Sequence, residues 1–571
     1  MTPLWSRPCF TLTLAGLLAS VGCRGAMSPR EESVAADLVI TGARVWTGDA
    51  LRPWAEAVAI RGAKLVSVGS TADAEALVGG QTKVMKLPGG LVLPGLIDAH
   101  VHPLGAGRQE LGCSLAELPS IAAILQKVKQ CADTTKGSGG FVHGRGWNLS
   151  LFPNANPGKK LLDEVVPDRP AYFRGEDGHS GWANSQALAL AGITKATKNP
   201  EHGIIERDAS GEPSGTLRED AIELIEKLLP APTLADDVAA LKLALSHVSA
   251  FGITSIMDAG VEERQLEAYQ ALGDALPVRV VGCIVADLAH PDKAVSRAKA
   301  LREKFGGNPR LRPTCVKIYL DGVLEGETAA LLNPYLDHPQ SSGALNVEPA
   351  VLAELVTSLE AERFQVHVHV IGDRPTRVAL DAFAASSVAN GERAKDLRPT
   401  LAHLQLVDAA DHARFSQLGV IANAQAFWAY PDTYIRDVNT PQVGPERVAR
   451  MYPFGSLQRA GARIVGGSDW PVSSLNPLDA AEVLVTRQDP KTNAGPVLTD
   501  SEKVDIDAAL RAYTSQGAFL LHQETETGVL AVGKDADVVV LDRDVTAGAP
   551  SAINAARVVL TLLGGRTVYP R

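Results

Sequence analysis

The chain has 571 residues, of which 45% are apolar and 21% charged, and this is enough for several domains and a large core in a globular enzyme. The formal net charge of −10 excludes nucleic acid as an expected partner, because phosphate binding requires a basic surface. The sequence also contains no zinc-finger spacing, no P-loop and no dinucleotide-binding glycine pattern.

The first 23 residues have the pattern of a signal peptide. Arg7 precedes a short apolar run, residues 10–21, which is too short to span a bilayer as a mature helix. Val21-Gly22-Cys23 resembles a bacterial lipoprotein cleavage site, although Ser20 stands where that motif usually has leucine. The alternatives are plain secretion and an uncleaved anchor. We expect an exported bacterial protein, periplasmic or attached to the outer membrane or cell surface through lipidated Cys23, with residues 24–36 as a tether.

Short strands with glycine turns occur at both ends of the mature chain. They include residues 37–40, 58–60 and 64–69 at one end, and residues 536–542 and 558–563 at the other. Short strands separated by such turns predict a small β-sandwich. We therefore expect residues 37–94 and 505–571 to form the two halves of one composite sandwich.

Between these ends, eight apolar segments with strand character alternate with helix-like stretches. Eight such alternations predict an α/β fold of the (β/α)₈ barrel type, here over residues 95–104 and 233–504. The first two strands are too far apart for a simple connection, so residues 105–232 are predicted to form an inserted subdomain over the barrel mouth. The strands are expected to begin near residues 96, 252, 278, 314, 364, 400, 420 and 463, and the helices include residues 234–250, 349–363 and 375–389.

Polar side chains interrupt these apolar segments within or near their carboxyl ends. His100 and His102 are two residues apart on a strand, so both would point the same way and suit a divalent metal such as zinc. Burying an unpaired lysine, histidine or aspartate is unfavourable, and a shared metal would supply the missing partner. The candidate ligands are His100, His102, Lys317, His369, His403 and Asp469.

The order His-x-His, Lys, His, His, Asp resembles the amidohydrolase superfamily, and within it the amidohydrolase family 3 branch that includes N-substituted formamide deformylases. The resemblance covers residues 37–570 and extends to Gly144–Asn148, Gly178–Ser185 and Gly203–Arg207. It implies a metal-dependent hydrolase of carbon–nitrogen bonds other than peptide bonds. The expected partner is a small-molecule substrate, such as an N-acyl or N-formyl amide.

The same resemblance implies a site with one or two metal ions, most readily zinc. His100, His102 and Asp469 would hold one ion, and His369 and His403 a second.

For two of the candidate ligands, Lys317 and His369, the sequence allows an alternative interpretation. Lys317 stands where many family members carry a carboxylated lysine that bridges two metals; otherwise it would pair with Asp321 or Glu325 in the core and a single-metal site would be expected. His367 shares a strand face with His369, but the family pattern places the ligand just before Val-Ile-Gly-Asp, which selects His369.

The expected mechanism is hydrolysis by metal-activated water. Asp469 would act as general base and then as general acid, and His179 would contact the developing oxyanion. Arg145, Arg207 and Arg218 would either meet a substrate carboxylate or form salt bridges within the insertion. Five aromatic residues are expected to line the pocket or to pack the insertion onto the barrel: Trp147, Trp182, Phe427, Trp428 and Trp470.

Other functions fit the same sequence less well. A deaminase or a cyclic-amide or lactone hydrolase of the superfamily would use the same metal site. A surface binding protein without activity would have no need of the ligand set, and a structural zinc site favours cysteines. Cys113 and Cys131 are predicted either to form a disulfide or to remain free, and Cys283 and Cys315 are predicted to be core residues.

Overall fold

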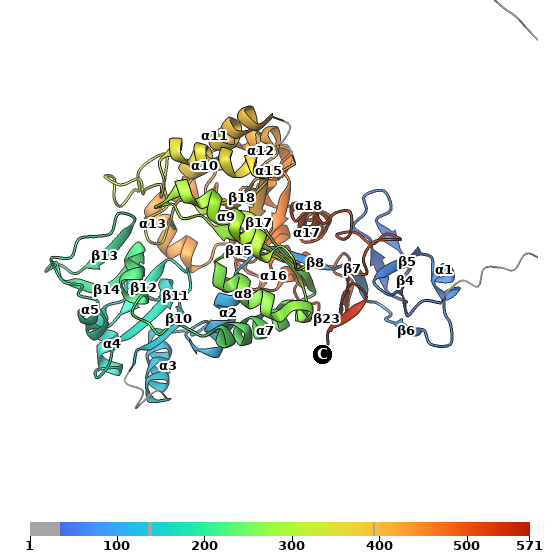
Figure 1. Cartoon of the computed structure of the whole chain (residues 1–571), viewed down its shortest axis with the longest axis horizontal. Coiled ribbons are helices and arrows are strands. Elements are labelled where there is room, and N and C mark those ends of the chain that lie inside the picture. Colours follow the sequence, from blue (N-terminus) through green and yellow to red (C-terminus); the bar gives the residue numbers. More distant parts are fainter. Residues whose placement is uncertain (1–34, 135–139, 392–393, 395, 571) are drawn as a thin grey trace, which may run out of the picture.

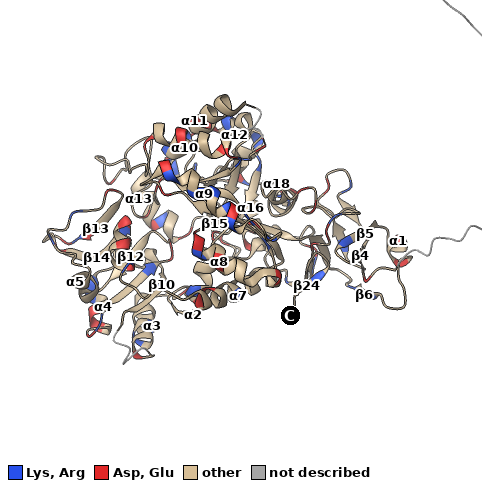
Figure 2. Cartoon of the chain, viewed as in Figure 1, with Lys and Arg blue, Asp and Glu red and all other residues tan. Residues whose placement is uncertain are grey.

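The computed structural model describes residues 35–134, 140–391, 394 and 396–570. The expected signal peptide, the lipidation site Cys23 and most of the tether fall outside these ranges. Within them, no helix is both long and apolar enough to cross a membrane. Figure 1 shows the barrel at the centre, the inserted region on its left and the strands of the two chain ends on its right. Basic and acidic residues occur in all three parts of the ribbon (Figure 2).

Eight parallel strands form a nearly closed barrel, as the sequence predicted. They are hydrogen-bonded in chain order, and each begins within three residues of its predicted position. Nearly all their residues are buried, because helices cover the outer face and side chains fill the interior. The strands are β8 (Leu96–Val101), β15 (Ile253–Val261), β16 (Arg279–Val285), β17 (Leu311–Tyr319), β18 (Gln365–Val370), β19 (Thr400–His403), β20 (Ile421–Ala424) and β21 (Ile464–Gly466).

The first and last barrel strands, β8 and β21, meet through bonds that lie just beyond the strand ladders. The backbone N–H of Asp469 donates to the carbonyl of His100 at 2.7 Å, and the N–H of His102 donates to the carbonyl of Trp470 at 2.9 Å. The seam of the barrel therefore passes directly through three of the candidate metal ligands.

Helices follow the strands as expected, and side-chain hydrogen bonds at the helix ends help to fix where they begin. The helix α7 (Leu234–Ala250) begins with a capping box, in which the side chains of Thr233 and Asp236 each accept a bond from the other's backbone N–H. The remaining helices around the barrel are α2 (Pro103–Leu111), α8 (Glu263–Leu272), α9 (Pro291–Phe305), α10 (Pro349–Ala361), α11 (Asp373–Asn390), α12 (His412–Leu418), α13 (Thr440–Val443), α14 (Pro445–Val448), α15 (Phe454–Arg459), α16 (Pro477–Thr486), α17 (Ile506–Ala512) and α18 (Ser515–Leu520).

The region between α2 and α7 contains its own six-stranded sheet, in the order β13-β14-β12-β11-β10-β9. A disulfide between Cys113 and Cys131 joins the edge strand β9 to helix α3. Of the two predicted alternatives for this pair, the structure therefore has the disulfide and not the free thiols. The elements are β9 (Cys113–Ser114), α3 (Ile121–Thr134), β10 (Val142–Trp147), α4 (Lys159–Val165), β11 (Ala171–Gly175), β12 (Ser180–Ala183), α5 (Ser185–Leu190), β13 (Gly203–Arg207), β14 (Pro213–Glu219) and α6 (Glu223–Glu226).

A second disulfide joins Cys283 to Cys315. Both cysteines are fully buried, as predicted for core residues, but the sequence interpretation did not foresee the bond between them. They are register partners on the adjacent strands β16 and β17, with Cα atoms 4.2 Å apart. This pairing depends on the register of the barrel, which apolar runs in the sequence do not reveal.

Both chain ends meet in a six-stranded sheet of order β24-β23-β22-β7-β2-β3, in which β22 runs antiparallel to β7. A separate four-stranded sheet has the order β5-β4-β1-β6. The composite sandwich and the domain boundaries stay predictions. The elements are β1 (Leu38–Thr41), β2 (Arg44–Trp46), β3 (Trp54–Ala55), β4 (Ala57–Arg61), β5 (Lys64–Gly69), α1 (Thr71–Glu75), β6 (Lys83–Lys86), β7 (Leu91–Pro94), β22 (Val538–Leu541), β23 (Val558–Leu563) and β24 (Arg566–Tyr569).

Glu360 on α10 makes the stability of the barrel depend on pH. Its side chain is only 2% exposed and accepts a bond from the Ser386 hydroxyl of α11. Burial raises the pKa of this carboxyl to about 7, although the Ser386 bond opposes the shift. Since the pKa in the unfolded chain is about 4.3, the folded state holds the proton more tightly, and stability falls as pH rises from about 4 to 7.

We therefore expect Glu360→Gln to raise the melting temperature more at pH 8 than at pH 5. The ionised carboxylate disfavours folding by on the order of 3 kcal/mol at pH 8, from the pKa difference between the two states. Thermal unfolding at both pH values measures the effect. The control is Glu354→Gln, an exposed position on the same helix. Equal shifts at both pH values in Glu360→Gln would contradict this account.

Candidate metal centre and catalytic pocket

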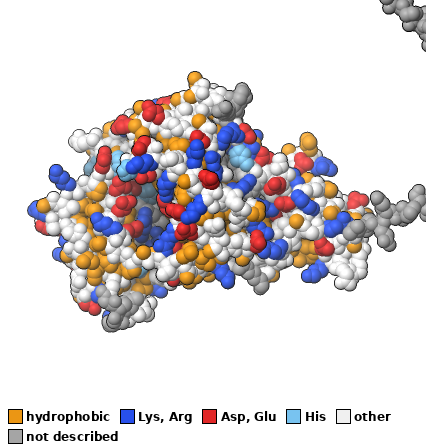
Figure 3. Space-filling model, in the orientation of Figure 1, with side chains coloured by type: hydrophobic (Ala, Val, Ile, Leu, Met, Phe, Trp, Pro, Cys, Tyr) orange, Lys and Arg blue, Asp and Glu red, His pale blue; other side chains and the backbone are white. Residues whose placement is uncertain are grey.

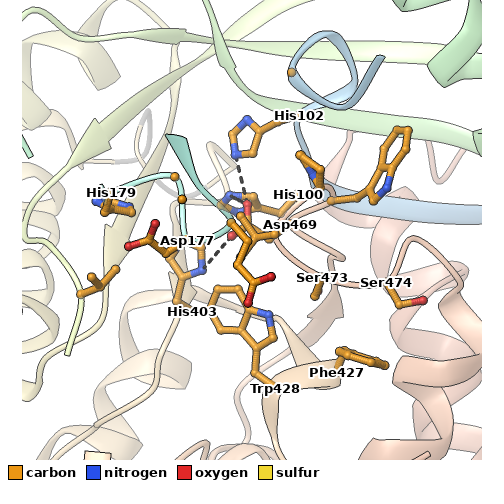
Figure 4. A pocket seen from close by; sticks show the side chains of 18 of the residues that line it. His100, His102, Asp177, His179, His403, Phe427, Trp428, Asp469, Ser473 and Ser474 are labelled. Carbon is orange, nitrogen blue, oxygen red and sulfur yellow. Dashed lines mark ion pairs between the residues drawn. The ribbon is translucent and has the colours of Figure 1, made fainter. Parts of the chain in front are cut away.

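The six candidate ligands line one pocket at the carboxyl ends of the barrel strands. Figure 4 shows His100, His102 and His403 gathered around Asp469, with Asp177 and His179 to one side. His100 is in β8, Lys317 in β17 and His369 in β18, and His403 ends β19. His102 follows β8, and Asp469 follows β21. This is the end of the barrel at which such folds build their active sites.

Asp469 is at the centre of the cluster. Its Oδ1 lies 3.1 Å from Nε2 of His102 and 3.4 Å from Nε2 of His100, and its Oδ2 lies 4.0 Å from Nδ1 of His403. One donor atom each from His100, His403 and Asp469 falls within 4.8 Å of the others. Both ring nitrogens of the buried His403 lack a hydrogen-bond partner among the described residues. Imidazole and carboxylate donors with unsatisfied lone pairs fit a divalent cation.

Lys317 belongs to this cluster and not to a separate core ion pair. It is fully buried, and its Nζ lies 3.4 Å from Nε2 of His100. Within the described part of the chain, neither Asp321 nor Glu325 is within ion-pair distance of it, so the alternative pairing is wrong. Burial lowers the pKa of Lys317 to about 7, although Asp469 opposes the shift, so a large share of the amine is uncharged at neutral pH.

The two histidines of β18 occupy different places. His369 lines the pocket, and its ring centre lies 4.5 Å from that of His403. Its Nδ1 is 3.2 Å from Oδ1 of Asp321, close enough for electrostatic orientation of the ring although the alignment is not that of a hydrogen bond. His367 does not line the pocket, and its Nε2 lies 2.9 Å from Nδ1 of His100. This arrangement favours His369 as the ligand.

The backbone at the site adopts sparsely populated conformations. His403 has a backbone φ of 77° and Asp469 a φ of 57°, positive values that residues other than glycine seldom adopt. A Cβ atom on Gly467 would lie 2.6 Å from the Cβ of His100, so only glycine fits there. Strain of this kind concentrates at functional sites, where the surrounding fold holds it in place.

His179 reaches the pocket from the turn between β11 and β12. Its ring centre lies 5.4 Å from that of His369, and its Nδ1 lies 2.7 Å from Oε2 of Glu219. The Thr328 hydroxyl donates to the other oxygen of Glu219 at 2.7 Å. Burial lowers the pKa of His179, but the Glu219 carboxylate outweighs it and raises the pKa to about 9. The sequence interpretation missed Glu219 and Thr328, which no motif marked.

The aromatic residues divide into two groups. Phe427, Trp428 and Trp470 line the pocket, and Trp428 stacks on His403 with ring centres 5.3 Å apart and an interplanar angle of 7°. The expectation that Trp147 and Trp182 are pocket walls is wrong. Both are fully buried, and they pack edge to face with ring centres 6.0 Å apart inside the core of the inserted region.

Two of the three arginines considered for a substrate carboxylate are occupied elsewhere. Arg207 donates to backbone carbonyls such as that of Thr197, and Arg218 donates to the Ser180 hydroxyl and the Ala155 carbonyl. Arg145 does line the pocket and donates to the Gly105 carbonyl at 3.1 Å.

Residues 83–569 match the model of a family described as the amidohydrolase family. The chain belongs to this family. It is 30% identical over 548 residues to the protein LONG AFTER FAR-RED 3 of Arabidopsis thaliana, covering 94% of this chain and 92% of that protein. It is 27% identical over 553 residues to the N-substituted formamide deformylase of Arthrobacter pascens, covering 94% and 98%.

A solved structure of an uncharacterised metal-dependent hydrolase from Pyrococcus horikoshii is similar to this amidohydrolase. The TM-score is 0.69 with 25% identity, over 90% of this chain and 99% of that one. Together with the buried donors around Asp469, the family identifies the protein as a metal-dependent hydrolase of carbon–nitrogen bonds.

Lys317→Ala is expected to weaken metal binding, because it removes a buried group that touches the donor cluster. Loss even of groups that only orient metal ligands weakens binding about 10- to 100-fold, so we expect a loss of at least about tenfold. Elemental analysis after dialysis against graded chelator measures the retained metal. The control is His143→Ala, an exposed residue of the inserted region that does not line the pocket. Retention equal to that of the control would remove Lys317 from the ligand set.

Proposed function

We propose that this amidohydrolase cleaves N-acyl or N-formyl amides of small molecules into a carboxylate and an amine. The observation that carries the proposal is the convergence of the candidate ligands on Asp469 at the bottom of one pocket, with His179 and Glu219 also lining it. The 27% identity to an N-substituted formamide deformylase over nearly the full length of both chains supports this substrate class.

We propose zinc as the metal, with two ions. His100, His102 and Asp469 would hold one ion, and His369 and His403 the other. A bound divalent metal supplies Lewis-acid chemistry, which acidifies a coordinated water and polarises a carbonyl. The lowered pKa of Lys317 supports carboxylation of its amine, since only the neutral amine is nucleophilic toward carbon dioxide. The product is an anionic oxygen donor that suits a bridging position.

Asp469 is the proposed proton carrier. Its carboxylate faces the pocket between His100, His102 and His403, so it can take a proton from the attacking water as general base. The same proton then passes to the amide nitrogen as the carbon–nitrogen bond breaks. An amine leaves poorly unless it is protonated, so this transfer is required for turnover.

His179 is the proposed contact for the carbonyl oxygen as that oxygen becomes negative. The Glu219 carboxylate keeps the ring positively charged at neutral pH, and the N–H of Glu219 donates to the His179 carbonyl at 3.0 Å. Two links therefore hold the imidazolium in one orientation before substrate arrives. Fixed charge of this kind stabilises a developing oxyanion without rearrangement during the reaction.

We also propose that the protein is exported and is either periplasmic or a lipoprotein of the outer membrane or cell surface, anchored through Cys23. The two disulfides, Cys113–Cys131 and Cys283–Cys315, support export because disulfides persist in oxidising compartments. Mass spectrometry of the mature amino terminus tests the proposal, since cleavage at a site other than Cys23 would contradict lipidation.

The proposed activity predicts amine release from N-formyl, N-acetyl or N-aroyl amides by the metal-replete protein. Chelation should abolish the release and zinc should restore it. Release that survives complete metal removal would contradict the metal-dependent mechanism. A metal-replete sample that releases no amine from any of these amides would contradict amide hydrolysis, and lactones, cyclic amides and deaminase substrates would be assayed next.

His179→Gln is expected to lower kcat by roughly 10²- to 10³-fold, the usual effect of removing one donor to an oxyanion. Glu219→Gln leaves the imidazole in place but removes its counter-charge, so its loss of kcat should be smaller. Metal content, measured in parallel, should stay at the wild-type value in both variants. Full activity of His179→Gln would show that this ring does not contact the reacting group.

A further inference from the structure

The pocket has a group of carboxylates that the reaction does not use. Glu176 and Asp177 follow β11, Glu325 follows β17 and Asp432 follows β20, and all four line the pocket. We call these four residues the carboxylate wall. Figure 3 shows the hollow between the inserted region and the barrel, with acidic side chains gathered at its edge.

The four carboxylates are close enough to act on one another. Burial raises the pKa of Glu176 to about 7, and Asp177 and Asp432 raise it further in the same direction. Burial likewise raises the pKa of Asp432 to about 7, with a contribution from Glu325. Carboxyl groups from three separate segments of the chain thus lie in one region of the pocket.

Among the residues that the structure describes, the wall accepts hydrogen bonds only from neutral donors. The Tyr434 hydroxyl donates to Glu176 at 2.5 Å, and the Ser180 hydroxyl donates to Asp177 at 2.6 Å. Further donors are the Ser180 N–H to Asp177 at 3.2 Å, the Asn439 amide to Glu325 at 3.0 Å and the Ile435 N–H to Asp432 at 2.9 Å.

Among the described residues, no lysine or arginine lies within ion-pair distance of any of the four carboxylates. Lys491, which lines the pocket, lowers the pKa of Glu176 electrostatically, and Arg436 does the same for Asp432, both without forming an ion pair with the wall. Arg174 is engaged by both oxygens of Glu226, at 3.0 and 2.9 Å. The wall therefore has positive neighbours in the pocket, Lys491 and the His179 ring, but no paired lysine or arginine among the described residues.

Tyr452 gives a second, independent indication of a ligand at this place. Its side chain is 3% exposed and lines the same pocket, and no hydrogen bond involves its hydroxyl among the described residues. Burial raises its pKa well above the ordinary value, and Glu325 and Asp432 raise it further, which places the phenol beside the wall. The phenol oxygen therefore lines the pocket without a protein partner among the described residues and is free to bond a ligand there.

The wall is next to the reacting groups. Asp177 and Glu325 both act electrostatically on His179, whose ring lies 5.4 Å from that of His369. A substrate whose amide carbonyl meets His179 would therefore extend its other end along the wall. Arg145 is elsewhere in the pocket, since its electrostatic neighbours are Arg174, Glu226 and Arg108 and not the wall.

We propose that the substrate of this enzyme carries a cationic group with N–H donors, a primary ammonium or a guanidinium, at the end remote from the scissile amide. The carboxylates and the Tyr452 oxygen are all acceptors, so a cation that donates several hydrogen bonds satisfies more of them than a neutral or quaternary group. This inference rests on the proposed amide hydrolysis and specifies its substrate class.

The test compares matched amides on the metal-replete wild-type enzyme. One series of N-acetyl and N-formyl alkylamines ends in an ammonium group, the second replaces that group by methyl, and the third by carboxylate. In each series the alkyl chain between the amide and the terminal group is lengthened step by step, and the length that gives the highest kcat/KM measures how far the wall lies from the scissile amide. At the best spacer, kcat/KM for the ammonium series should exceed that for the methyl series by at least about tenfold, or ~1.4 kcal/mol.

Variants of the wall identify the source of the preference. Glu325→Gln and Asp432→Asn should raise KM for the ammonium substrates and leave the methyl substrates almost unchanged, which a general loss of structure would not do. The control is Glu263→Gln, an exposed position on α8 that pairs with Lys304 outside the pocket.

Equal or better turnover of the methyl or carboxylate series would overturn this inference and leave the proposed amide hydrolysis standing. An ammonium preference that persists in both wall variants would also overturn it. If the metal-replete enzyme turned over none of the amides, the proposed function itself would fail and this inference with it.

Discussion

The structure depends on a group of buried candidate metal ligands whose hydrogen-bonding capacity the protein alone does not satisfy. Neither ring nitrogen of His403 has a hydrogen-bond partner among the described residues, and Nε2 of both His100 and His102 faces Asp469. Burying polar groups without partners disfavours folding by a few kilocalories per mole each. A metal that binds only the folded state removes this deficit, so its binding energy contributes directly to the stability of the fold.

The same residues close the barrel. The backbone groups of His100, His102 and Asp469 link the first strand to the last, while their side chains form the donor cluster. The left-handed backbone of Asp469 aims its carboxylate between the two histidines, and Gly467 lets the chain pass close to His100. Fold and site are therefore built from one set of contacts, and a change at the seam alters both.

The sequence predicted the barrel well because its strands are buried on both faces and so read as continuous apolar runs. The same runs marked the candidate ligands, since a lysine or histidine inside such a run requires a partner, and the structure brings these candidates to one pocket. Trp147 and Phe427 show where this reasoning stops. Both lie in segments with motif or strand-end character, yet one fills the core of the inserted region and the other lines the pocket.

The sequence interpretation also missed contacts between segments that are far apart along the chain. Asp258 interrupts the apolar strand β15, and this signal could have marked it, because its carboxylate lies 3.9 Å from Nδ1 of His102. No such signal marks Glu219, which lies 40 residues from its partner His179. Acidic residues are usually solvated, so only the folded chain shows which of them converge in a pocket.

The pocket is built from two parts of the chain. The candidate ligands come from the barrel strands, whereas His179, Glu176 and Asp177 come from the inserted region. Loops held on a rigid scaffold can change without disturbing the groups that the scaffold positions. Relatives that match this chain over nearly its full length can therefore share the metal site and still act on different molecules. A change in the charge of the carboxylate wall would therefore alter the choice of substrate without altering the candidate ligands.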